Sequence, residues 1–107
     1  MNIKQRNKQW RKSLKNRTEK EFITNWKSLN ININYEIIKN VAIIMSLPNH
    51  YLYPDDYLSD ILFNPYSDFS DVEAILYIEE RLQISNINYA IDTKLTLKEL
   101  FASNIHV

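Results

Sequence analysis

The chain has 107 residues, which is enough for one small domain with a hydrophobic core. It contains no cysteine and no glycine, which excludes disulfides, thiolate metal sites, cysteine nucleophiles and glycine-rich phosphate-binding loops. Its charges cancel overall, but residues 1–28 hold nine Lys/Arg and two Glu, while residues 29–107 hold four Lys/Arg and eleven Asp/Glu. We expect these parts, with formal charges of +7 and −7, to attract each other or to face different partners.

Residues 4–29 contain no proline and many strong helix formers, so helix is predicted there. A sparse apolar stripe follows a helical spacing, and it consists of Trp10, Leu14, Phe22, Trp26 and Leu29. Asn16 or Thr18 could mark a break that divides this segment into two short helices. We expect residues 1–30 to form a basic helical extension of an acidic helical bundle formed by residues 31–107.

The next segments predict a linker, a long helix and a short one. Residues 30–34 alternate Asn and Ile, and three asparagines in five residues make a poor strand, so a linker is predicted. Residues 35–47 have the apolar period of a helix buried on one side, with Asn34 as its cap and Pro48 at its end. Pro54 is expected in the first turn of another short helix, which runs to about Phe63.

Two capping boxes mark the starts of the last helices. Ser70 with Glu73 predicts a helix to about residue 83, and Thr96 with Glu99 predicts a final short helix. Residues 84–95 are interpreted as a loop anchored by two isoleucines. Several apolar residues of the first of these helices are expected to point inward or to flank the core: Val72, Ile75, Leu76, Ile78 and Leu82. The predicted class is all-α, a small antiparallel four-helix bundle with an N-terminal helical extension.

Residues 67–73, Ser-Asp-Phe-Ser-Asp-Val-Glu, resemble the Asp-Ser-Leu-Asp-x-Val-Glu pattern of acyl carrier proteins. Residues 78–84 and 96–100 resemble the acidic second helix of carriers and the start of their last helix. The resemblance covers about 50 residues and implies a carrier-like bundle. The carrier serine that bears phosphopantetheine is replaced here by Asp68, and a carboxylate cannot carry that arm. A shifted register would leave Ser67 or Ser70 as the acceptor.

Carboxylates and tyrosines gather between residues 50 and 71. Tyrosine is enriched at protein interfaces, and carboxylates steer the approach of basic partners. We therefore expect a partner-binding surface made of Tyr53, Asp55, Asp56, Tyr57, Asp60, Tyr66, Asp68 and Asp71. The plainer interpretation is that the rings cap the core and that the carboxylates are solvated or stabilise helix N-termini.

Small size, the lack of a catalytic set and this acidic, tyrosine-rich surface resemble the immunity proteins that bacteria pair with secreted toxins. The resemblance implies a non-catalytic inhibitor of a basic toxin domain, and we expect no cofactor, no metal and no small-molecule substrate. Two alternatives remain: a genuine or degenerate acyl carrier that docks onto acyl-transfer enzymes, and a small nucleic-acid-binding regulator that uses residues 4–20. The zero net charge and the lack of a recognition motif weigh against nucleic acid. Without a signal peptide or a long apolar run, we expect a cytoplasmic location and no membrane.

Overall fold

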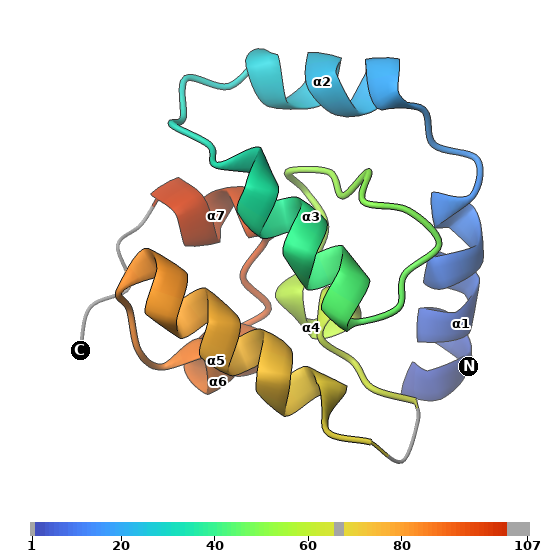
Figure 1. Ribbon diagram of the computed structural model, residues 1–107. Coiled ribbons are helices and arrows are strands. Elements are labelled where there is room, and N and C mark those ends of the chain that lie inside the picture. Colours follow the sequence, from blue (N-terminus) through green and yellow to red (C-terminus); the bar gives the residue numbers. More distant parts are fainter. Residues whose placement is uncertain (1, 66–67, 103–107) are drawn as a thin grey trace.

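The computed structural model describes residues 2–65 and 68–102 (Figure 1). It contains seven helices in these ranges: α1 (Ile3–Leu14), α2 (Glu19–Lys27), α3 (Tyr35–Ile44), α4 (Leu58–Ile61), α5 (Ser70–Leu82), α6 (Ile87–Asp92) and α7 (Leu97–Ala102). No strand occurs in the same ranges, and one isolated antiparallel bridge pairs Tyr57 with Thr96. The all-α class is thus confirmed for the described chain, whereas the four-helix antiparallel arrangement stays a prediction. None of the helices described is both long and apolar enough to cross a membrane.

Side-chain caps explain where α2 and α3 begin. Thr18 and Glu21 form a capping box, because Thr18 Oγ1 accepts from the Glu21 N–H at 3.2 Å and Glu21 Oε1 accepts from the Thr18 N–H at 3.1 Å. The break that Asn16 or Thr18 predicts therefore lies between α1 and α2. At α3, Asn34 Oδ1 accepts from the Glu36 N–H at 3.0 Å, which satisfies one of the orphan amides of the first turn as expected.

Of the two capping boxes predicted in the second half of the chain, one forms. Thr96 and Glu99 bond reciprocally at 3.1 and 3.4 Å and start α7. At α5, by contrast, Phe69 holds the N-cap position without a side-chain cap. Ser70 is already helical, and its N–H and hydroxyl both donate to Asp68 Oδ1, at 3.0 and 2.7 Å. Asp68 therefore accepts the Ser70 N–H that the predicted box would have given to Glu73, and the Glu73 N–H donates to the Phe69 carbonyl at 3.0 Å.

The short helix α4 begins at Leu58, and the prediction of a helix that starts at Pro54 is wrong. The turn before α4 serves a different helix. Its carbonyls at Pro54 and Asp56 accept from the amides of Lys98 and Leu97, at 2.9 and 2.8 Å. Those amides belong to the first turn of α7, where no partner exists within the helix itself. A tertiary requirement therefore keeps this turn out of helical geometry.

The segment read as a loop contains α6. Ile87 and Ala90 on this helix are completely buried, and Ile91 is half-buried. A six-residue helix has little stability of its own, so the packing of its apolar side supports it. Its N-cap residue Asn86 has a φ of 66°, a left-handed conformation that asparagine tolerates well.

Turns in this glycine-free chain use other residues at positive φ. The described residues include four of them, and all flank helices: Ser46, Gln83, Asn86 and Lys94. Only one of the four is asparagine, a residue that tolerates this left-handed region well. The other three residues adopt a backbone conformation that glycine could adopt at no steric cost. Ser46 terminates α3 at Ile44, earlier than the predicted residue 47.

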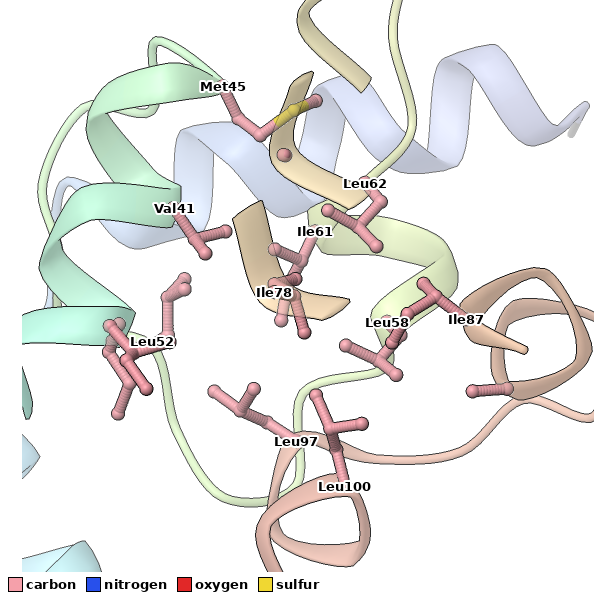
Figure 2. Close-up of a cluster of buried hydrophobic side chains, with 14 of the residues drawn as sticks. Val41, Met45, Leu52, Leu58, Ile61, Leu62, Ile78, Ile87, Leu97 and Leu100 are labelled. Atoms are coloured by element: carbon pink, nitrogen blue, oxygen red, sulfur yellow. The ribbon is translucent and has the colours of Figure 1, made fainter. Parts of the chain in front are cut away.

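The buried side chains form one hydrophobic cluster to which both halves of the chain contribute (Figure 2). Figure 2 shows side chains from several helices and from one loop converging, among them Val41, Leu52, Ile61, Ile78, Leu97 and Leu100. The basic segment 1–30 supplies Leu14, Phe22 and Trp26 to the same cluster. Trp26 is 1% exposed, and its indole N–H donates to the Leu52 carbonyl at 2.8 Å. The first thirty residues therefore pack against the remainder of the chain.

Candidate protein-binding surface

The residues predicted to contact a partner lie in different environments. Tyr66 lies outside the described residues. Of the seven that are described, the exposed ones are Asp55, Tyr57 and Asp68. The half-buried ones are Tyr53, Asp60 and Asp71, and Asp56 is buried. The exposed members come from the turn before α4 and from the turn before α5.

Asp56 is an internal carboxylate that four donors hold in place. It accepts from both Nη atoms of Arg17, at 2.6 and 3.0 Å, from the Tyr53 N–H at 2.6 Å and from the Trp10 indole N–H at 3.2 Å. Its side chain is 8% exposed and that of Arg17 is 13% exposed. The carboxylate is fully engaged within the fold and is not available to a partner, which corrects its assignment to the partner-binding surface.

Tyr53 and Asp60 lie close to this ion pair. The guanidinium carbon of Arg17 sits 3.8 Å from the centre of the Tyr53 ring, and burial raises the pKa of the Tyr53 hydroxyl. Burial also raises the pKa of the Asp60 carboxyl, against the opposing effect of Arg6. The main-chain carbonyl of Asp60 accepts from the side-chain amide of Asn7 at 2.8 Å. Asp60 therefore belongs to the packing of α1 against α4, and Tyr53 packs on the arginine of the internal ion pair.

Asp55 and Tyr57 face solvent in the turn before α4. The Asp55 side chain is 81% exposed, and its carboxylate lies 2.7 Å from Lys98 Nζ. This ion pair raises the pKa of Lys98. Because both partners are exposed, the pair contributes little to stability. Tyr57 is 47% exposed, which leaves much of its ring free to contact another molecule.

The turn before α5 concentrates negative charge. The side-chain amide of Asn64 donates to Asp68 Oδ1 at 3.0 Å, to the Asp68 carbonyl at 2.7 Å and to Asp71 Oδ1 at 3.2 Å. Hydrogen bonds from the Ser70 N–H and hydroxyl, followed by that from Asn64, lower the pKa of the Asp68 carboxyl. The exposed Asp68 therefore stays ionised down to lower pH than a free aspartate.

The α5 helix presents a row of exposed apolar side chains that the sequence interpretation missed. Phe69 is 82% exposed, Val72 is 47% exposed and Leu76 is 60% exposed. Val72 and Leu76 lie on one side of the helix, and Phe69, its N-cap residue, precedes Val72 by three residues. Glu73 and Glu80 are exposed on the same side. We refer to these five residues as the α5 face.

The prediction that Val72 and Leu76 point inward or flank the core is corrected by their exposure. On a wheel of 3.6 residues per turn they fall opposite Ala74 and Ile78, the residues that α5 buries. A typical surface helix has one apolar stripe, which faces the core, whereas α5 has two. This second stripe is a signal present in the sequence, and a helical wheel would have revealed it.

The neighbouring helix α3 widens this apolar surface. α3 and α5 pack against each other, and they lie side by side at the front of Figure 1. The Asn40 side-chain amide donates to the Tyr77 hydroxyl at 2.8 Å across their boundary. Ile43, one helical turn beyond Asn40, is 65% exposed. Single exposed apolar residues are common, but a group on adjacent helices is typical of an interaction surface.

The α5 face is also acidic. Two carboxylates, Glu73 and Glu80, belong to it, and residues 68–82 as a whole contain five carboxylates and one cation, Arg81. The arrangement offers an apolar strip within a field of negative charge. In the described ranges, no group of three or more His, Asp or Glu side chains is placed to hold a metal ion.

Comparison of the chain with known protein families, with characterised proteins and with solved structures finds no match.

Proposed function

We propose that the chain is a non-catalytic protein–protein interaction module whose α5 face binds a basic protein. The observation that supports this proposal is the exposed row of Phe69, Val72 and Leu76 within an acidic helix. Each such side chain gains about 1.5–3 kcal/mol on full burial, and aromatic residues are enriched in the buried cores of interfaces. Negative charge around the row would accelerate association with a basic surface and would reject acidic ones.

Within this class, we favour an immunity-type inhibitor that neutralises a basic toxin domain. The chain is small, and residues 29–107 carry a formal charge of −7. Its partner-facing residues would be the α5 face together with the exposed Asp55, Tyr57 and Asp68 of the predicted set. An inhibitor of this kind needs only complementarity to its target, and no reactive group.

A second candidate is a degenerate acyl carrier that docks onto acyl-transfer enzymes through the same helix. The feature that favours it is the position of Asp68, at the turn that leads into an exposed acidic helix. This candidate would also require the antiparallel four-helix arrangement that the sequence predicts. Ser70 would be its most accessible described acceptor, but the Ser70 hydroxyl already donates to Asp68. Incubation with a phosphopantetheinyl transferase and coenzyme A, followed by mass spectrometry, tests it; an unmodified mass rejects a working carrier.

Site-specific cross-linking tests the main proposal. A photoreactive phenylalanine analogue would replace Leu76 in one variant and Tyr89 in the control, and both would be expressed in the cells that make the chain. Tyr89 is a suitable control because it is 61% exposed, close to the 60% of Leu76, but lies on α6. We expect one basic protein to cross-link at position 76 and not at position 89. Equal labelling at both positions would contradict the proposed surface.

The identified protein then allows a quantitative test. Leu76→Glu should weaken a purified one-to-one complex at least 30-fold, the effect of losing a residue worth about 2 kcal/mol, while Tyr89→Glu should leave its Kd unchanged. If the partner is a toxin, its expression should arrest growth, and co-expression of the wild-type chain should relieve the arrest where Leu76→Glu fails. Binding without toxicity would retain the interaction module and reject the inhibitor.

A further inference from the structure

The α1 helix carries a row of exposed lysines that is not part of the α5 face. Lys4, Lys8, Lys12 and Lys15 are all exposed and follow one another at spacings of four, four and three residues. They line one side of an open groove of about 490 Å³ whose other side is formed by Ser46, Pro48 and Pro65. At 1.5 Å per residue, the row is about 16 Å long.

The three arginines near this row, by contrast, contact the rest of the fold. Arg17 pairs with the buried Asp56, and Arg6 lies close enough to Asp60 to oppose the rise in its pKa. The guanidinium of Arg11 donates to the carbonyls of Met45 and Phe63, at 3.3 and 3.2 Å. These contacts fix α1 against the rest of the fold. The lysine row is therefore presented on a helix that is held in place.

No carboxylate of the described residues pairs with the row. The two ion pairs found in the described ranges are Arg17–Asp56 and Lys98–Asp55. The first acidic residue of the chain is Glu19, so α1 itself offers no negative charge. Although the net charge of the chain is zero, the charges are separated along it, and one helix surface is purely cationic.

We propose that this lysine row binds the phosphate backbone of double-stranded DNA without sequence preference. The phosphates of one strand are spaced by about 3.4 Å along the duplex axis, so a row of about 16 Å spans about five of them. Lysine contacts of this kind position a protein on the backbone without reading bases. The exposed polar side chains beside the row, Gln5 and Gln9, suit additional phosphate contacts.

Other occupants fit this surface less well. Single strands are usually held by base stacking on aromatic rings, whereas the single aromatic residue of α1, Trp10, is half-buried with its indole N–H on Asp56. A membrane-surface helix needs a broad apolar side, and the only large apolar side chain that α1 exposes is Ile3. The α5 face of a second copy would bring three large apolar side chains, whereas beside the lysine row the groove offers only Pro48 and Pro65 as apolar lining.

The test is fluorescence anisotropy with a labelled duplex of about 20 base pairs, from 50 to 200 mM NaCl. Four phosphate contacts predict a slope of log K against log salt of about −3.6, which is a loss of roughly 150-fold over this range. Each of Lys4→Gln, Lys8→Gln and Lys12→Gln should make the slope less steep by about 0.9. Lys39→Gln removes an exposed lysine from α3 and serves as the charge-matched control.

The proposal would be overturned by no binding at 50 mM NaCl, by a slope that Lys8→Gln and Lys39→Gln change equally, or by tighter binding to vesicles of anionic phospholipid than to the duplex. Preference for a single-stranded oligonucleotide of the same length would also contradict it. Circular dichroism of each variant establishes that the fold is retained, and the lysine side chains are exposed, so we expect no loss of structure.

Discussion

Replacement of Asp56 by alanine should destabilise the domain strongly, because this carboxylate joins α1, the segment after it and the loop before α4. The change would leave three donors without their acceptor: the Arg17 guanidinium, the Tyr53 amide and the Trp10 indole. Loss of one partner of a buried ion pair costs about 3–5 kcal/mol. A domain of this size has a free energy of unfolding of about 5–15 kcal/mol, so a large part of its stability would be lost.

The neighbouring Asp55 provides the matched control. It is also an aspartate in an ion pair, but it is 81% exposed, so Asp55→Ala should cost at most about 1 kcal/mol. With an unfolding entropy of about 0.2 kcal/mol/K, Asp56→Ala should lower Tm by about 15–25 °C. Thermal and urea unfolding followed by circular dichroism measure both effects. Equal stability of the Asp55→Ala and Asp56→Ala variants would refute the reasoning.

A double-mutant cycle would isolate the ion pair itself. Arg17→Met removes the cation and keeps most of the aliphatic volume, and it leaves Asp56 with the Tyr53 and Trp10 donors. The cost of the double variant should be well below the sum of the single costs, since the second change removes a charge that the first left unpaired. Additive costs would mean that the two side chains do not act as a pair.

Three further predictions concern local stability. Burial raises the pKa of Asp60, so its ionised form disfavours the folded state; Asp60→Asn should stabilise the domain at pH 7, and this gain should disappear as the pH falls through the carboxyl range. The carboxyl of Asp68 has a lowered pKa, so its ionised form should favour the folded state, and urea unfolding at several pH values should show an effect of opposite sign for this residue. Thr18→Ala removes the cap of α2 and should cost about 1 kcal/mol, and a cost near zero would contradict the capping geometry. Ile87→Ala should cost about 2–5 kcal/mol, whereas Tyr89→Ala should stay within about 0.5 kcal/mol; equal losses on thermal unfolding would argue against the packing of α6.

Local signals predicted the helices that carry their own caps and periodicity. Asn34 and Thr96 each satisfy a first-turn amide, and their helices begin where these residues predict. Thr18, one of the two residues predicted to mark a break, caps α2. Failures occur where distant residues decide. α6 is stabilised by burial of Ile87, and the turn at Pro54 is held open by the amides of α7. On α6 the inward residues Ile87, Ala90 and Ile91 do follow a helical spacing, but the pattern spans a single short helix and was interpreted as loop anchors. The turn at Pro54 leaves no such pattern in the sequence around it.

The candidate surface was predicted only in outline. Carboxylate density identified the acidic region, but the sequence cannot reveal that Arg17, thirty-nine residues away, encloses Asp56. The exposure of Phe69 and Leu76 depends on which side of α5 packs against α3. Burial is a property of the assembled fold, and two apolar stripes on one helix leave that choice open to sequence reasoning.

The long sequence separations that tie α1 and α2 to the fold have a consequence for how the chain matures on the ribosome. Asn7, Trp10 and Trp26 bond to partners 53, 46 and 26 residues later. The amino-terminal helices are synthesised first but cannot dock until those partners emerge. At about 5–20 residues per second, the cationic segment stays exposed for a few seconds in each round of synthesis. During that interval the segment can make premature contacts with polyanions such as ribosomal RNA. Only completion of the fold shields the side of the segment that becomes buried.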